Sequence, residues 1–106
     1  MDGKIDWSLA HDQLVEIVQR GGSGAVAAGH IYRFVQSAPD NGCEGWPRLR
    51  TNRDICWWQY KELTVFVCLE EGRLVVLAMA EGTRPADFDN GSRMAERHLN
   101  HLRKRK

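Results

Sequence analysis

The chain lacks several features that identify a function from sequence. None of the apolar runs among its 106 residues approaches the ~20 residues needed to span a bilayer. The opening segment MDGKIDWSLAHDQ lacks the apolar core of a signal peptide. There is no Gly-rich phosphate loop, no Ser/His/Asp order and no close carboxylate pair in a distinctive context. The sequence therefore predicts no membrane segment and gives no independent sign of catalysis.

Cysteine and histidine are scarce. The three cysteines, Cys43, Cys56 and Cys68, cannot all pair within one chain, and their spacings of 13 and 12 residues differ from those of a zinc site. We expect reduced thiols in a cytoplasmic protein. His98 and His101 would share one helix face, but no further ligand stands at a recognisable spacing. We predict no metal and no cofactor.

The charge has no strong overall sign. The formal net charge is +1, and 42% hydrophobic with 27% charged residues is an ordinary composition for a globular protein. The distribution is uneven, because residues 91–106 hold six basic and one acidic side chain, whereas residues 54–90 hold three basic and seven acidic ones. A basic end on a near-neutral body is typical of an interaction feature.

What the chain does contain is a long β-favouring stretch. It divides into predicted strands at Asp54–Tyr60, Leu63–Leu69 and Leu74–Ala80. Glu71-Gly72 fits the tip of a hairpin, because Gly accepts the positive φ of a tight turn. This placement pairs Leu69 with Leu74, Val67 with Val76 and Val65 with Ala78.

Both faces of this predicted sheet are apolar. The third strand carries Leu74, Val76 and Ala78 on one face and Val75, Leu77 and Met79 on the other. A half-solvated antiparallel strand would instead alternate apolar with polar residues. Both faces must therefore be covered, one by a pair of helices and the other by either a C-terminal helix or a second subunit.

Two amphipathic helices are predicted before the sheet. Ser8 suits the N-cap of the first, and Gly21-Gly22 suits its end. Ser23 suits the N-cap of the second, which Pro39 to Gly42 terminates. The apolar stripes at helical spacing are Ala10, Leu14, Ile17 and Val18 in the first helix and Ala27, Ile31, Phe34 and Val35 in the second.

The remaining segments complete one domain. Lys4–Trp7 alternates polar with apolar residues and fits a short additional strand. Asp87–Gly91 is turn-like, Arg93–Lys104 is helix-prone, and Arg103–Lys106 forms a basic tail. We predict a single α+β domain over residues 1–106: an N-terminal helical hairpin packed on a three- to four-stranded antiparallel sheet, with a C-terminal helix.

Trp57 and Trp58 are candidate binding residues. Adjacent strand residues point to opposite faces, so the two indoles cannot enter the same core. One is expected under the helical hairpin. The other lies on the second face, either as a stacking platform for a base or an apolar ligand, or covered by the C-terminal helix or a dimer partner.

Arginines gather at the ends of the predicted strands. Arg48, Arg50 and Arg53 precede the first strand, and Arg84 follows the last. Guanidinium groups bind phosphate bidentately. These residues are compatible with one RNA-binding concavity that also includes Arg97, Arg103, Lys104, Arg105 and Lys106. Scattered surface charge with a solubilising tail remains the alternative.

The order of elements resembles that of the RelE/ParE superfamily of small bacterial toxins. KIDWSLAHDQLVEIV is similar to the family's opening, in which a strand ending near Trp-Ser passes directly into a helix. RLRTNRDICWWQYKELTVFVCLEEGRLVVLAMAEGTR is similar to its sheet, which ends in an arginine. The resemblance covers nearly the whole chain. It implies an antitoxin partner and one of two activities: messenger RNA cleavage on the ribosome, or inhibition of DNA gyrase.

The resemblance also implies catalytic residues for the RNA-cleaving branch. Arg84 matches the arginine that closes the last strand, and Lys61 is the basic residue nearest the family's mid-sheet arginine. With Arg50 and Arg53 they would neutralise charge developing at the scissile phosphate. The family's catalytic tyrosine has no counterpart, because the nearest aromatic residue is Phe88, which has no hydroxyl.

We therefore expect a toxin acting on RNA or the translation apparatus, an endoribonuclease if it is an enzyme. The alternative is a non-enzymatic binding or assembly module, such as a small accessory protein of mobile DNA. Such a module would form a homodimer through the second sheet face and hold Trp57 or Trp58 in a ligand pocket. No membrane partner is expected.

Overall fold

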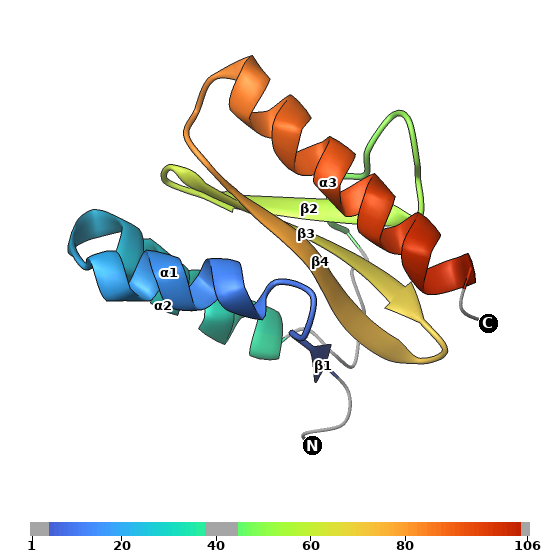
Figure 1. Cartoon of the computed structure of the whole chain (residues 1–106), viewed down its shortest axis with the longest axis horizontal. Coiled ribbons are helices and arrows are strands. Elements are labelled where there is room, and N and C mark those ends of the chain that lie inside the picture. Colours follow the sequence, from blue (N-terminus) through green and yellow to red (C-terminus); the bar gives the residue numbers. More distant parts are fainter. Residues whose placement is uncertain (1–4, 38–44, 105–106) are drawn as a thin grey trace.

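The computed structural model describes residues 5–37 and 45–104, and it confirms the α+β layout. A four-stranded sheet lies between a helical hairpin and a long C-terminal helix (Figure 1). The elements in chain order are β1 (Ile5–Asp6), α1 (His11–Arg20), α2 (Gly22–Gln36), β2 (Ile55–Tyr60), β3 (Leu63–Glu70), β4 (Arg73–Glu81) and α3 (Pro85–Lys104).

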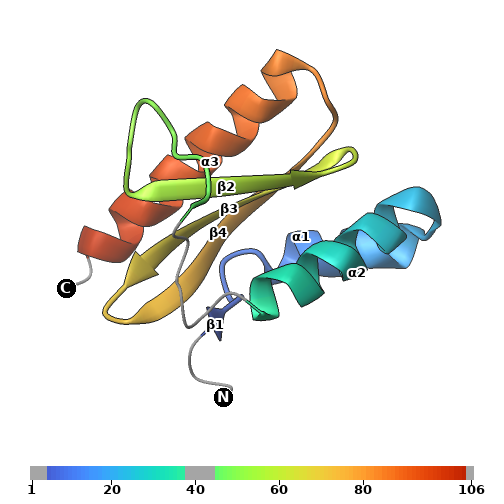
Figure 2. The same ribbon diagram turned by 180° about the vertical axis from the view of Figure 1, so that it is seen from behind.

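The sheet is mixed, with the strand order β1-β4-β3-β2. The antiparallel run β2-β3-β4 is confirmed. The prediction that the whole sheet is antiparallel is wrong, because β1 pairs with β4 in parallel, with Ile5 opposite Leu74. The alternation of Lys4–Trp7 indicates a strand but carries no information on its direction, and Figure 2 shows that β1 enters at the sheet edge beside the helical hairpin.

The central hairpin follows the predicted turn. Glu71 and Gly72 both have positive φ, at 52° and 78°, as a type I′ turn requires. The predicted pairs Leu69–Leu74 and Val67–Val76 are confirmed, but Val65 lies opposite Met79 and not opposite Ala78. The register shifts between Phe66 and Val67, because a β-bulge adds one residue to β4.

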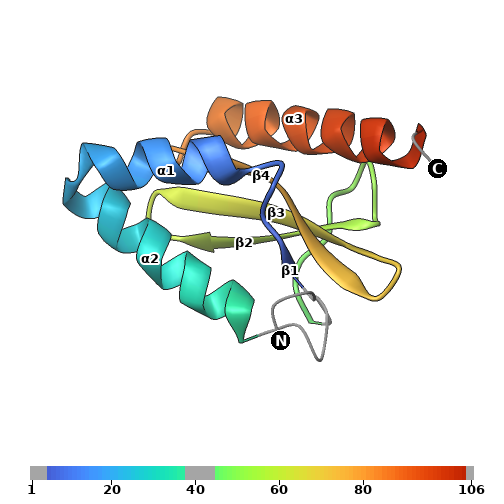
Figure 3. The ribbon, with the colours of Figure 1, turned by 60° about the horizontal axis from the view of Figure 1, so that its bottom comes forward.

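Each face of the sheet is covered by helices, as the apolar patterning predicts. Figure 3 shows the α1–α2 hairpin on one side and α3 on the other. The core under the hairpin includes Val65, Val67 and Val76, and the core under α3 includes Phe66 and Leu77. The second face is therefore covered by the chain's own C-terminal helix.

The predicted N-caps of α1 and α2 are wrong. Neither helix has a side-chain cap. The Ser8 hydroxyl donates instead to Asp6 Oδ1 at 2.6 Å, and Ser23 donates to Glu62 Oε2 at 3.2 Å. Both stripes are otherwise buried or half-buried, except that Val18 is 49% exposed. The predicted stop at residues 39–42 lies outside the described residues.

Helix α3 begins eight residues earlier than predicted, at Pro85, so the expected turn at Asp87–Gly91 is wrong. The backbone N–H of Arg84 donates to Asp87 Oδ2 at 3.1 Å. This is half of a capping box, and Pro85 fits the first helical position because it needs no N–H there. A capping pattern thus overrides the turn-like composition of this segment.

The prediction of three reduced thiols is also wrong, because Cys56 is disulfide-bonded. Cys56 and Cys68 are both buried, on opposite faces of the sheet. Cys43 lies outside the described residues. Sequence spacing does not reveal which cysteines meet in space.

Candidate functional site

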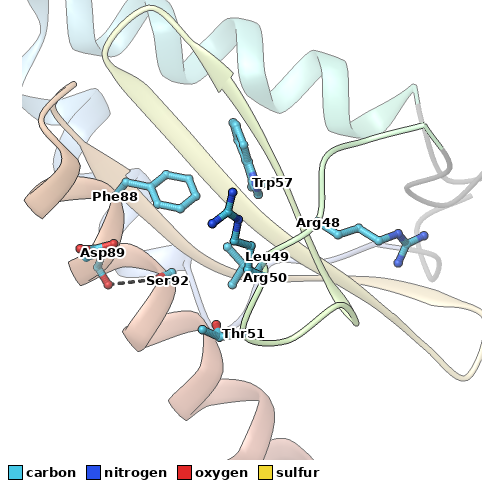
Figure 4. Close-up of a pocket in the computed structure, with 8 residues that line it drawn as sticks. All are labelled: Arg48, Leu49, Arg50, Thr51, Trp57, Phe88, Asp89 and Ser92. Atoms are coloured by element: carbon cyan, nitrogen blue, oxygen red, sulfur yellow. Dashed lines mark hydrogen bonds between the residues drawn. The ribbon is translucent and has the colours of Figure 1, made fainter.

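A pocket opens beside α3, between that helix, strand β2 and the segment that precedes it (Figure 4). Its volume is about 370 Å³, within the range of small-ligand sites. The residues that line it are Arg48, Leu49, Arg50, Thr51, Trp57, Phe88, Asp89 and Ser92. The pocket thus combines aromatic, cationic, anionic and hydroxyl groups.

The segment carrying Arg50 is held on both sides. Leu49 is buried in the core under α3, and its N–H donates to the carbonyl of Ile55 at 3.0 Å. Thr51 Oγ1 donates to Glu96 Oε2 on α3 at 2.6 Å. Trp57 N–H donates to the carbonyl of Pro47 at 3.0 Å. The backbone at Arg50 is therefore fixed although its side chain is exposed.

The aromatic wall of the pocket is Trp57 with Phe88. Their ring centroids lie 5.0 Å apart in an edge-to-face arrangement of 78°, a favourable aromatic geometry. Trp57 is half-buried. The guanidinium of Arg50 points toward these rings, whereas the side chain of Arg48 points away (Figure 4) and donates from Nη1 to the carbonyl of Arg53 at 2.9 Å.

Trp58 is placed on the other face, as adjacent strand positions require. It packs against Phe34, at a centroid distance of 4.8 Å, and against Trp46, at 5.9 Å. Tyr60 stacks on His30 at 3.8 Å. Trp58 thus belongs to the core under the hairpin, and Trp57 is the indole left for a ligand.

Arg84 lies at the start of α3 and is paired. Its Nε and Nη2 donate to the two carboxylate oxygens of Asp87, each at 3.0 Å. The hydrogen bond from Arg84 holds the pKa of Asp87 below its ordinary value, and the same bond raises the pKa of Arg84. The guanidinium predicted to act on phosphate is therefore partly neutralised by its own capping residue.

The four predicted catalytic residues do not converge. Arg53 lies just before β2 and Lys61 just after it, and a six-residue strand separates its ends by about 20 Å. Lys61 lies near Arg84, because the N–H of Gly82 donates to the carbonyl of Glu62 at 2.7 Å. Of the four, only Arg50 lines the pocket. The expectation of one catalytic cluster is thus not met.

Only part of the basic tail Arg103–Lys106 is available to bind a phosphate. Arg103 binds Glu70 Oε1 at 2.8 Å and Asp54 Oδ2 at 3.0 Å, and these bonds, that to Glu70 first, raise its pKa. Lys104 is exposed at the end of α3. Arg105 and Lys106 lie outside the described residues.

Sequence reasoning named Arg97 and Lys104 as binding residues but missed the basic ridge that they form along α3 with Arg93 and His101. Arg93, Arg97, His101 and Lys104 are all exposed, and their spacing of four, four and three residues places them on one side of the helix. Within the part of the chain that the structure describes, Arg93, Arg97 and Lys104 form no ion pair. The i, i+4 repeat from Arg93 was the signal that could have identified this α3 basic ridge.

His98 and His101 of α3 are not grouped with other metal-ligating side chains among the described residues. His98 Nδ1 lies 2.6 Å from the carbonyl of Leu77. Across residues 5–37 and 45–104, no three His, Cys, Asp or Glu side chains are grouped so as to hold a metal ion. The described helices also include none that is long and apolar enough to cross a membrane.

The chain matches no protein-family model, no curated protein and no solved structure. The resemblance to RelE/ParE toxins therefore stays a prediction.

Proposed function

We propose that this chain is a toxin-like protein of the RelE/ParE type that acts by binding RNA, with one base in the Trp57 pocket. The observation that carries the proposal is the Arg50 guanidinium, which points toward Trp57 and Phe88 (Figure 4) and forms no ion pair among the described residues. An aromatic surface beside an unpaired guanidinium is the usual platform for a single-stranded nucleic acid.

The α3 basic ridge supports this proposal. A helix rises 1.5 Å per residue, so the four-residue spacing of Arg93 and Arg97 places these two cations about 6 Å apart along α3, and Lys104 follows about 10 Å further on. Long flexible side chains at that spacing reach successive phosphates of one strand. The ridge and the pocket both involve α3, because Phe88, Asp89 and Ser92 line the pocket from that helix.

The proposed action is binding, not cleavage. Arg84 is paired with Asp87, and Arg53 and Lys61 lie at opposite ends of β2. No cluster of unpaired cations therefore surrounds one phosphate in the described part of the chain. A protein of this kind would act by occluding an RNA or a ribosomal site, and would be held inactive by an antitoxin.

Fluorescence anisotropy with a labelled 12-nucleotide RNA tests the proposal. We expect Arg50→Ala to weaken binding roughly tenfold, since it removes a charged contact beside a stacked base. Arg53→Ala is the matched control, because Arg53 is an exposed arginine of the same segment outside the pocket. Absence of binding by the wild type at low salt, or equal loss in both variants, contradicts the proposal.

Expression in bacteria gives the second readout. We expect growth arrest that Arg50→Ala relieves, without fragmentation of messenger RNA. Specific RNA fragments would instead assign cleavage to this chain. A small gene beside it whose product restores growth would identify the antitoxin.

The second candidate is the non-enzymatic binding module, which the pocket volume of about 370 Å³ also suits. Helix α3 covers the second sheet face, so the dimer through that face is not available to it. Self-association through another surface stays a prediction, and sedimentation at micromolar concentration tests it.

A further inference from the structure

Arg50 and Asp89 line one pocket from different elements. Arg50 belongs to the segment before β2, and Asp89 lies in the second turn of α3. They form no ion pair with each other, and the Asp89 carboxylate forms no hydrogen bond to a described residue. The pocket thus has a bidentate donor, the guanidinium of Arg50, and a bidentate acceptor, the carboxylate of Asp89, and the two charges do not pair with each other.

These groups restrict the ligand. The carboxylate of Asp89 disfavours a bare phosphate, and the guanidinium of Arg50 disfavours a cation. The flat side chains of Trp57 and Phe88 favour an aromatic ring. A fitting ligand is therefore a planar ring with two acceptors on one edge and two adjacent N–H donors on another.

We propose that the pocket selects guanine. Its O6 and N7 accept from a guanidinium bidentately, which is the commonest specific contact of arginine with a base. Its N1–H and N2–H₂ groups donate side by side on the Watson–Crick edge, where a carboxylate accepts both. The ring stacks on Trp57. This inference rests on the proposed function for taking RNA as the source of the base, and a free guanine nucleotide offers the same chemistry.

The other bases lack this pattern. Adenine presents an acceptor at N1 beside its single amino group, so its Watson–Crick edge would set a lone pair against Asp89. Cytosine has the same fault, with N3 beside its amino group. Uracil offers one N–H between two carbonyls. Each would leave one side chain of the pocket unpaired, and an unpaired polar group is what makes such a site selective.

Titration with the four nucleoside monophosphates tests this, with binding measured by calorimetry. We expect GMP to bind at least tenfold more tightly than AMP, CMP or UMP, because one good bidentate pair discriminates by about that factor. Asp89→Asn should lower the preference for GMP over AMP, since an amide oxygen accepts only one of the two N–H donors of guanine and the amide can pair with N1 and N6 of adenine, while Arg50 still favours guanine. Glu16→Gln is the matched control, because Glu16 is an exposed carboxylate on a different helix, α1. It should leave the preference for GMP unchanged.

The outcomes separate the two proposals. If wild type binds oligo-U and a G-containing RNA equally and Arg50→Ala weakens both, RNA binding holds and guanine selection is wrong. If GMP binds and Asp89→Asn lowers the preference for GMP over AMP while no RNA binds, the ligand is a free nucleotide and the RNA proposal fails. Equal binding of GMP and AMP, or an unchanged preference in a folded Asp89→Asn variant, overturns the inference.

Discussion

The side-chain amide of Gln13 pairs with the backbone of Met79 as a strand residue would. Gln13 Nε2 donates to the Met79 carbonyl at 2.9 Å, and the Met79 N–H donates to Gln13 Oε1 at 3.1 Å. Strand β1 pairs with β4 only at Leu74 and Val75. Gln13 therefore satisfies backbone groups on the β4 edge that the short β1 does not reach, and fixes α1 to the sheet.

Gln13→Ala should destabilise the fold by about 1–3 kcal/mol, since two partly buried hydrogen bonds are lost and both Met79 groups are left without a partner. Gln13→Glu should be worse at neutral pH, because a carboxylate would face the Met79 carbonyl, and it should recover on acidification. Urea denaturation measures both. Gln19→Ala, at an exposed position of the same helix, should change stability little, and a comparable loss there would contradict the assignment.

Gly91 lets α3 pack closely against the sheet. A Cβ at this position would lie 2.6 Å from Phe66 Cε1 and 2.7 Å from Ala80 Cβ. Gly91→Ala should therefore destabilise the fold by about 1–3 kcal/mol through overpacking, even though alanine favours helices. Thermal unfolding measures the effect.

Gly29→Ala is the control for Gly91, because Gly29 lies inside α2 and the nearest atom to an added Cβ is Arg33 Nη1 at 3.9 Å. This substitution should stabilise the protein by about 0.5–1 kcal/mol through helix propensity. A stabilising Gly91→Ala would show that α3 does not contact the sheet as described.

Much of the fold was predictable because the pattern of apolar and polar residues within each strand indicates which of its faces are buried. The apolar runs on both sides of Glu71-Gly72 identified the central hairpin, and the lack of polar alternation in β4 required cover on both faces. The direction of β1 and the bulge in β4 were not predictable, since both depend on which strand edge is available after packing. The start of α3 was missed because the segment Asp87–Gly91 has the composition of a turn. Its glycine, Gly91, instead allows a close contact between the helix and the sheet.

Less of the candidate site was predictable. The opposite facing of Trp57 and Trp58 followed from strand geometry, and Trp57 does line the pocket. The roles of the cations did not follow, because a charge is available only where no carboxylate lies near it in space. Asp87 pairs with Arg84, and Glu70 pairs with Arg103, whereas Arg50 has no ion pair with another described residue. Such pairings between separate elements leave no local trace in the sequence.

The Arg84–Asp87 pair predicts a pH dependence of stability. The hydrogen bonds that Arg84 donates to Asp87 hold the pKa of Asp87 below the ordinary value of 3.8. A lowered pKa in the folded state stabilises the protein above the unfolded pKa, and this contribution disappears as the pH falls through the folded value. Asp87→Asn should therefore be less stable than wild type at neutral pH, with a difference that shrinks below pH ~4. Urea unfolding across pH 2–7 measures it.

The loss of wild-type stability at acidic pH cannot be assigned to Asp87 alone. The pKa of Asp6 is also lowered, chiefly by the hydrogen bond from Ser8. The informative quantity is the difference between wild type and Asp87→Asn. If that difference stays constant with pH, Arg84 does not pair with the ionised carboxylate.

Arg97 and Arg103 are both α3 arginines, but their environments predict opposite effects of substitution by alanine. Arg103 holds Glu70 and Asp54, so Arg103→Ala should lower stability, by ~1 kcal/mol or less for the exposed pair with Asp54, and should hardly affect RNA affinity. Arg97 belongs to the α3 basic ridge without an ion pair among the described residues. Arg97→Ala should leave stability unchanged, weaken RNA binding and lower the slope of log K against log salt by about 0.7. Urea unfolding and anisotropy at several salt concentrations test the two together. A loss of stability at Arg97, or an unchanged salt slope, would exclude a phosphate contact at the ridge.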